Sequence, residues 1–161
     1  MAERAAKGLR EARFFDDFKV GERYRSGPVA IREDTILGFA EHYDPQPFHT
    51  DPDYARGTMF DGLIASGWQV LSETFARSVE DGFLRKSGLG SEGLEDLRWL
   101  RPVRPGDRIE LQFEVLDTAD DAENADRGLV TFDVAALNQN DEVAMSYRLR
   151  AIVRRRMARM H

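Results

Sequence analysis

The stretch SGWQVLSETFARSVEDGFL, residues 66–84, carries the strongest helical pattern in the chain. Ser66 is a suitable N-cap for a helix that starts here. The apolar side chains that follow recur at spacings of three and four, which is the period of an amphipathic helix. They are Trp68, Leu71, Phe75, Val79 and Phe83. The stretch therefore predicts one long helix whose aromatic stripe must be covered by another apolar layer.

Alternating apolar and polar residues after Gly90 predict the layer that covers this helix. The alternation runs over Ile109–Val115, Val130–Ala136 and Val143–Val153, and an earlier strand is expected at about Ser91–Leu100. Segments of this kind form antiparallel strands with one buried face. Four such strands supply the apolar surface that the aromatic stripe needs.

A first strand and two shorter helices are expected before the long helix. The strand covers about Tyr24–Ile31. A helix over Glu33–Tyr43 follows, because its apolar residues recur at three and four. Asp51 and Pro52 can begin another helix that continues through Arg56. This order of elements predicts a single α+β domain in which an antiparallel sheet wraps around one long central helix, the hot-dog arrangement.

Length and composition are those of one soluble globular domain. The chain has 161 residues, of which 42% are hydrophobic and 32% are charged, so one sizeable core can form. Cysteine is absent, which excludes disulfides and thiolate sites. The net charge of −6 argues against a nucleic-acid binder. No apolar run suits a membrane span or a secretory signal, so we expect a cytoplasmic protein without a membrane partner.

Three parts of the chain are distinguished by composition. Residues 1–13 mix Ala, Lys, Glu and Arg without an apolar face, and we expect them to form a flexible N-terminal arm. Residues 14–154 hold the predicted elements and form the domain. Residues 155–161 form a basic C-terminal tail. No internal repeat divides the chain further.

Residues with catalytic potential concentrate in the segment DPQPFHTDP, residues 44–52. Its first two prolines stiffen the turn between Asp44 and His49, so both side chains can be held toward a common point at little entropic cost. An Asp and a His that face one water form an acid and base pair. Each also has a simpler interpretation, as a turn or cap residue and as a surface histidine. A metal site would need His42 and Asp51, which the predicted helix and its neighbouring cap already explain, so no metal is expected.

This segment resembles the signature of the MaoC-like family of (R)-specific enoyl-CoA hydratases, which reads Asp, any residue, Asn, Pro, an aliphatic residue, His. Asp44 and His49 match it in identity and spacing, and the similarity extends over about residues 14–153. Two positions differ from the family pattern. Gln46 stands where the family usually has Asn, and Ser66 stands where many members have His before the glycine.

The resemblance implies a hydro-lyase of fatty acid metabolism that acts on a thioester of coenzyme A or acyl carrier protein. It implies Asp44 and His49 as catalytic residues, with the Gly67 backbone N–H as the oxyanion donor and with Ser66 and Gln46 at the substrate. It also implies a homodimer or higher oligomer, and no cofactor besides the coenzyme A of the substrate. Ser66 is expected to act as a helix cap, so Ser66→Ala should lower stability more than turnover.

A basic cluster in the second half of the chain has two interpretations. It consists of Arg98, Arg101 and Arg104. Charge clusters are commonly solvated surface groups. Arginines at the mouth of a pocket could instead bind the phosphates of coenzyme A through charge-assisted hydrogen bonds.

Other functions on the same fold remain open from the sequence. A thioesterase would use a carboxylate to attack the carbonyl carbon or to activate water there, and a non-catalytic protein would only bind acyl-CoA. A hydratase domain within a larger assembly is a third alternative. The acyl chain that is accepted depends on how the aromatic residues around the pocket pack. These are Phe60, Trp68, Phe75 and Phe83.

Overall fold

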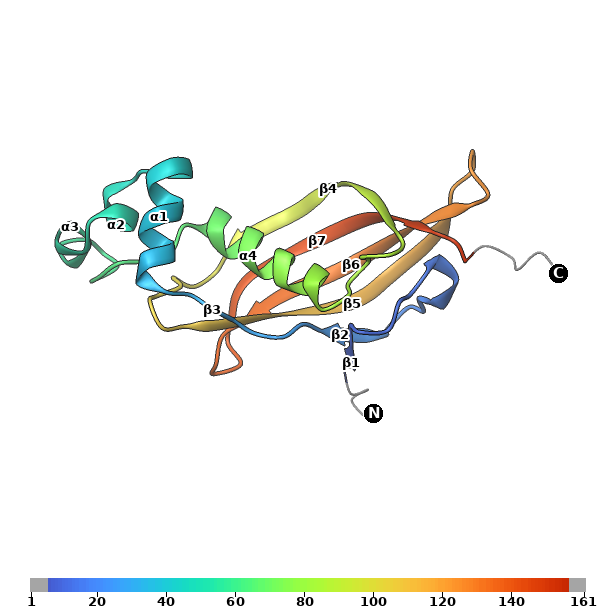
Figure 1. Ribbon diagram of the computed structural model, residues 1–161, viewed down its shortest axis with the longest axis horizontal. Coiled ribbons are helices and arrows are strands. Elements are labelled where there is room, and N and C mark those ends of the chain that lie inside the picture. The colour runs from blue at the N-terminus through green and yellow to red at the C-terminus, as the bar shows by residue number, and fades with distance from the viewer. Residues whose placement is uncertain (1–5, 157–161) are drawn as a thin grey trace.

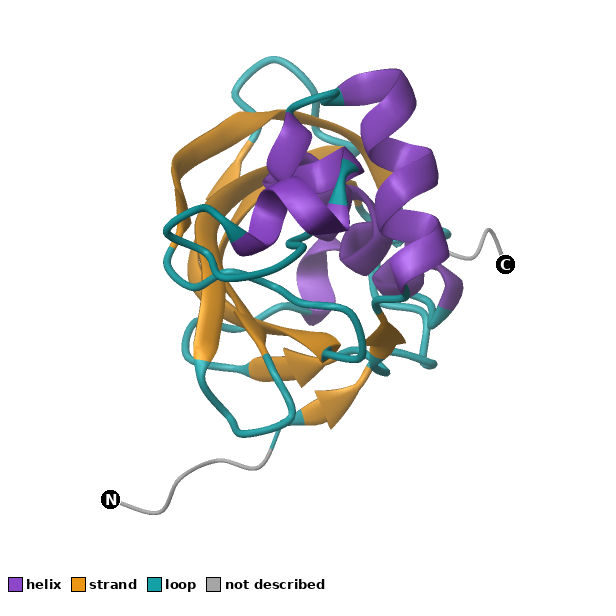
Figure 2. Cartoon of the chain, turned by 90° about the vertical axis from the view of Figure 1, so that its left-hand side faces the viewer, coloured by secondary structure: helices purple, strands orange, loops and turns teal. Residues whose placement is uncertain are grey.

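The computed structural model describes residues 6–156 and places a mostly antiparallel sheet around a central helix (Figure 1). The helix, α4, spans Gly67–Glu80. The strands run in the order β1-β2-β5-β6-β7-β4, and β3 pairs with β5. Their bounds are β1 Lys7–Gly8, β2 Arg23–Arg25, β3 Val29–Ala30, β4 Gly88–Trp99, β5 Arg108–Asp120, β6 Arg127–Leu137 and β7 Val143–Arg154. Figure 2 shows the sheet curving about the helices, so the predicted hot-dog fold is confirmed.

The core lies between the inner face of the sheet and α4. The alternation predicted for the strands is present, because every second side chain in the first part of β5 is fully buried. These side chains are Ile109, Leu111, Phe113 and Val115. At the centre of the core, Phe83 stacks on Phe113 with ring centroids 4.0 Å apart and meets the edge of Phe132 at 5.2 Å. Such aromatic contacts add to the free energy gained from burial alone.

The face that α4 turns toward the core differs from the prediction. Its buried residues are Gln69, Val70, Thr74 and Ser78. The predicted aromatic stripe is only partly covered, and 53% of Trp68 is exposed. Periodicity identified the apolar stripe but not the side of the helix that lies on the sheet. The helix also ends at Glu80, because Gly82 adopts a φ of 116° and redirects the chain before Phe83.

Three short helices form one end of the molecule, next to the start of α4 (Figure 1). They are α1 Glu33–Tyr43, α2 Pro47–Thr50 and α3 Pro52–Arg56. The predicted bounds of α1 and α3 are confirmed. The Asp51 carboxylate caps α3 by accepting hydrogen bonds from two backbone N–H groups of its first turn. The sequence did not predict α2, although proline at its first position is a usual start of a helix.

The N-terminal region is more ordered than the flexible arm expected over residues 1–13. Strand β1 pairs in parallel with β2, and Leu9 is buried in the core. Residues 1–5 of the expected arm lie outside the described residues. The single strand predicted over 24–31 is two short strands, β2 and β3. Phe15–Asp17 adds one turn of 3-10 helix before them.

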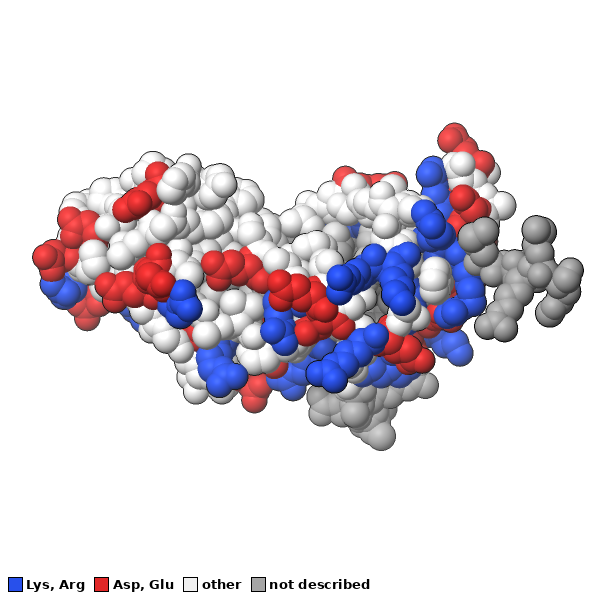
Figure 3. All heavy atoms as spheres, viewed as in Figure 1, with Lys and Arg blue, Asp and Glu red and all other residues white. Residues whose placement is uncertain are grey.

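The last described residues hold the end of β7 to the N-terminal region. Arg155 forms ion pairs with Asp16 and Asp120, and Arg156 forms one with Asp17. The remainder of the expected basic tail, 157–161, lies outside the described residues. On the face drawn in Figure 3, acidic and basic side chains are interspersed. None of the helices between residues 6 and 156 has the length and apolar character that a membrane span needs.

Candidate active site

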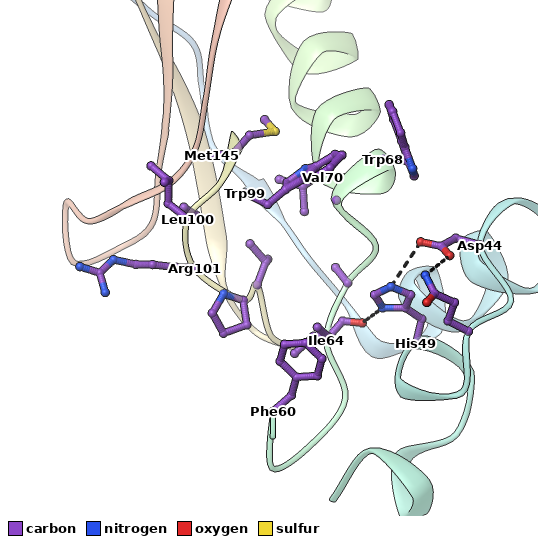
Figure 4. A pocket seen from close by; sticks show the side chains of 16 residues that line it. Asp44, His49, Phe60, Ile64, Trp68, Val70, Trp99, Leu100, Arg101 and Met145 are labelled. Atoms are coloured by element: carbon purple, nitrogen blue, oxygen red, sulfur yellow. Dashed lines mark hydrogen bonds and ion pairs between the residues drawn. The ribbon is translucent and has the colours of Figure 1, made fainter. Parts of the chain in front are cut away.

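A cavity of about 460 Å³ opens where the helical end of the molecule meets α4 and the sheet. Its polar side comes from the end of α1, from α2 and from the start of α4. Its apolar side comes from the loop before α4 and from the neighbouring ends of β4 and β7. The polar residues Asp44 and His49 lie opposite Trp99, Leu100 and Met145 (Figure 4), and Gln46 also lines the cavity. Four segments that are distant in sequence therefore build one pocket.

His49 has a fixed orientation in this pocket. It lies on α2 and only 5% of it is exposed. Its Nδ1 is 2.8 Å from the backbone carbonyl oxygen of Ile64, which can only accept, so Nδ1 carries the proton and donates it. Its Nε2 therefore faces Asp44, whose Oδ2 lies 3.3 Å away. Both residues of the predicted pair are brought together at the pocket wall (Figure 4).

Asp44 is held by donors on both oxygens. It stands at the C-cap of α1, where the helix stops before Pro45. The Gln46 side-chain amide donates to Oδ1 at 2.8 Å, and the Ser66 hydroxyl donates to Oδ2 at 2.7 Å. Partial burial raises the pKa of the Asp44 carboxyl, but these two hydrogen bonds and the charge of His49 together hold that pKa below its usual value. Asp44 is therefore an anion that can accept a further proton or hydrogen bond.

Ser66 connects Asp44 to the start of α4. Its hydroxyl oxygen accepts a hydrogen bond from the backbone N–H of Trp68 at 3.3 Å, and its hydroxyl group donates a hydrogen bond to Asp44. The expected cap is confirmed, and the same side chain also contacts the carboxylate, a contact that the sequence did not predict. The neighbouring Gly67 N–H is the first of the helix and donates to no acceptor among residues 6–156. An unpaired N–H at a helix N-terminus favours negative charge placed near it.

Comparison with known proteins agrees with this geometry. The family described as MaoC like domain matches residues 17–136. The chain belongs to this family. A crystal structure of the MaoC-like dehydratase from Rhodospirillum rubrum is 36% identical, with a TM-score of 0.85, and the match covers 91% of this chain and 100% of that one.

Two further relatives of this MaoC-like protein carry the name hydratase. Mesaconyl-CoA hydratase from Cereibacter sphaeroides is 25% identical over 146 residues, which cover 89% of this chain but only 42% of that protein. The (R)-hydratase PhaJ1 from Pseudomonas aeruginosa is 21% identical, with a TM-score of 0.71 and coverage of 97% and 96% of the two chains. This last likeness shows the shared fold. Hydratases thus occur among the relatives of this chain.

The predicted arginine cluster is not brought together at the pocket. Arg101 lines the cavity and has one distant ion pair, with Glu142 at 3.8 Å. Arg104 donates to the backbone carbonyl of Phe60 and so supports the loop beside the cavity. Arg98 lines a separate small surface cavity together with Asp133. Only Arg101 is placed where it could meet a ligand of the active-site pocket.

Several groups of the site were not predicted. The Ile64 carbonyl orients His49, and no side-chain pattern marks a backbone acceptor in advance. Trp99 reaches the pocket from the end of β4, although the residues around it in the sequence predict only a strand. Among the described residues, no group of three or more His, Asp or Glu side chains is arranged to hold a metal ion.

Proposed function

We propose that this MaoC-like protein catalyses the reversible addition of water to a 2-enoyl-CoA thioester and forms the (R)-3-hydroxyacyl thioester. The observation that carries the proposal is the contact between Asp44 and His49 in a pocket that also contains the Gly67 N–H. Hydration needs a base for water, an acid for carbon C2 and a donor for the thioester oxygen. The pocket offers a group for each need.

In this proposal Asp44 and His49 act together, because the pair takes up one proton and returns one proton in each cycle. A water bound by both side chains loses one proton to the pair while its oxygen attacks C3 of the enoyl group. The pair returns one proton to C2, so water is added overall and the pair regains its starting state. The reverse sequence expels water, and the direction is then set by the concentrations of the two thioesters.

The start of α4 would stabilise the negative charge that develops on the thioester oxygen. In this assignment the Gly67 N–H donates to that oxygen, and the helix dipole adds to the stabilisation. Ser66 does not contact the thioester in this assignment. It holds Asp44 at the distance from which water can be shared with His49, and Gln46 does the same from the other oxygen.

Substrate binding and assembly are parts of the same proposal. Coenzyme A would enter as part of the substrate, with Arg101 near its phosphates, and no other cofactor is invoked. A soluble thioester of fatty acid metabolism suits the cytoplasmic location expected from the sequence. Strand β4 is an edge strand and pairs only with β7 within the described chain. Because open edges favour pairing, a homodimer would join two β4 strands.

The test is an absorbance assay of enoyl-CoA disappearance, with crotonyl-CoA as the first substrate and a panel of longer and branched acyl groups. The expected result is hydration to the (R)-3-hydroxyacyl-CoA, identified by chiral analysis. Release of free coenzyme A without hydration would instead identify a thioesterase. Binding of the thioesters without any change in them would identify a non-catalytic binding protein, and both results contradict the proposal.

A further inference from the structure

A second cavity follows the active-site cavity along the same side of α4. The active-site cavity is lined by Gly67, Trp68 and Val70 of the helix, and the second cavity starts at Leu71 and continues past Phe75. The strands give the same order. On β7, Ala144 and Met145 line the first cavity, and Tyr147, Leu149 and Ala151 line the second. On β4, which runs antiparallel to β7, the lining passes from Trp99 back to Gly88. The two cavities are thus consecutive parts of one trough between α4 and the β4–β7 pair.

The second cavity is large and mainly apolar. Its volume is about 580 Å³, which exceeds that of the active-site cavity. The side chains that surround it come from the partly exposed stripe of α4 and from the inner face of the strands. They include Leu71, Phe75, Val79, Leu94, Leu149 and Ala151. Apolar walls of this kind suit a hydrocarbon chain.

Trp99 lines the active-site cavity and is the β4 residue of that cavity nearest in sequence to the second cavity, whose β4 lining begins at Leu94. Its indole extends from β4 to the first turn of α4, where a Cβ added at Gly67 would lie only 2.2 Å from the ring atoms Cε2 and Nε1. Its ring also meets that of Trp68 edge to face, with centroids 5.2 Å apart. Figure 4 shows Trp99 between the strand and the first turn of the helix. The two rings together fill the space between β4, which carries Trp99, and α4, which carries Trp68.

The close approach of the Trp99 ring to the helix requires a glycine at position 67. Any side chain there would overlap the Trp99 ring and displace it from the helix. Trp99 and Gly67 line the active-site cavity and not the second one, which fits a ring that forms a wall between the two. No residue lines both cavities within residues 6–156.

We propose that Trp99, supported by Trp68, ends the acyl-binding part of the active site and restricts the protein to thioesters with short acyl groups. This inference rests on the proposed function, because it assigns an acyl thioester to the active-site cavity. If a smaller residue replaced Trp99, a longer acyl group could extend into the second cavity. Trp99 is then the residue that determines the length of the substrate.

The experiment compares crotonyl-CoA with trans-2-octenoyl-CoA in the wild type and in Trp99→Leu. The wild type should prefer crotonyl-CoA. In Trp99→Leu, the ratio of kcat/KM for octenoyl-CoA to that for crotonyl-CoA should rise at least ~10-fold, since even one methylene placed in an apolar pocket changes selectivity by that order. Trp99→Phe keeps a large ring at the position and should keep the wild-type preference.

A refilled variant shows whether the longer chain enters the second cavity. Leu94 lines that cavity but not the active-site cavity, so Leu94→Trp added to Trp99→Leu should remove the gain for octenoyl-CoA. Circular dichroism and melting curves check the fold of each variant. If Trp99→Leu does not fold, Trp68→Leu serves instead, because Trp68 is about half exposed and forms the other part of the wall.

Equilibrium binding separates this inference from the proposed reaction. Calorimetry with the unreactive butyryl-CoA and octanoyl-CoA reports chain selection without turnover. A shift toward octanoyl-CoA in Trp99→Leu, without hydration by any variant, would support the wall and contradict the hydratase. A wild type that accepts both chain lengths equally, or a Trp99→Leu variant with unchanged selectivity, would overturn the wall. Failure to bind either thioester would overturn both.

Discussion

The two ends of α4 are held by different forces. Beyond its C-terminus, Phe83 is enclosed by apolar side chains and contacts two other aromatic rings of the core. At its N-terminus, Ser66 is fully buried but makes directional hydrogen bonds to Asp44 and to the Trp68 backbone. Apolar packing depends on area and has no preferred direction, whereas a hydrogen bond fixes one atom relative to another.

Apolar packing at one end of α4 therefore stabilises the helix, and hydrogen bonds at the other end orient the side chains of the site. The aromatic end supplies burial and therefore stability. The polar end couples α4 to α1, and a second link there joins Gln69 of α4 to Thr35 of α1 at 3.3 Å. Because Asp44 follows directly on α1, these links set its position. Substitutions at the two ends should therefore change different measured quantities.

The largest effect is expected from Phe83→Ala at the aromatic end. It removes a buried ring and leaves a cavity, so the free energy of unfolding should fall by about 3–5 kcal/mol, as measured by urea denaturation. Tyr43→Ala is the matched control at the polar end. Its ring is 74% exposed, and its loss should change stability by no more than about 0.5 kcal/mol. Equal losses in both variants would contradict the assignment of stability to the aromatic end.

Asp44→Asn and His49→Ala should show the opposite behaviour. Each removes one member of the proposed acid and base pair, so turnover on the best enoyl-CoA should fall by at least ~100-fold. The overall fold should persist, because neither side chain belongs to the apolar core. Steady-state kinetics together with circular dichroism test this expectation. Substantial activity in both folded variants would remove the pair from the mechanism.

A smaller effect is expected from Ser66→Ala. The variant loses a hydrogen bond to a charged acceptor, so turnover should fall ~10-fold. That hydrogen bond lowers the pKa of Asp44. Its loss should raise this pKa, and the acidic limb of the pH–rate profile should move to higher pH.

The control for Ser66→Ala is a serine on the same helix that does not contact Asp44. The Ser72 hydroxyl donates to the Trp68 carbonyl, so Ser72→Ala should leave the acidic limb where it is in the wild type. If Ser66→Ala only lowers the melting temperature and leaves the pH profile unchanged, Ser66 is a cap and does not position Asp44.

Local patterns in the sequence predicted most elements of the fold. The apolar spacing over α1 and the Asp51 cap of α3 gave the correct bounds, because these features act within one or two turns. The inward face of α4 could not be predicted in the same way. Periodicity places Trp68 and Phe75 on one stripe, but the side that meets the sheet depends on distant strands. Likewise, β1 exists only through its pairing with β2.

The sequence indicated the contact between Asp44 and His49 but not the groups around it. Asp44 and His49 lie in one short motif, and the spacing between them is visible in the chain. Ser66 contacts Asp44 across 22 positions in sequence, so its second contact follows from the tertiary structure alone. The same holds for Trp99, which reaches the helix from a strand whose pattern gives no sign of a cavity wall.

The position of the proposed catalytic pair within six consecutive residues has a consequence for how the proposed activity can be inherited. Residues 44–49 carry both reactive side chains, while the trough is built by α4, β4 and β7. A short substitution or deletion in that one segment would abolish the proposed chemistry and leave the trough in place. The fold can therefore pass between catalytic and purely ligand-binding descendants through a change confined to a single small loop and helix.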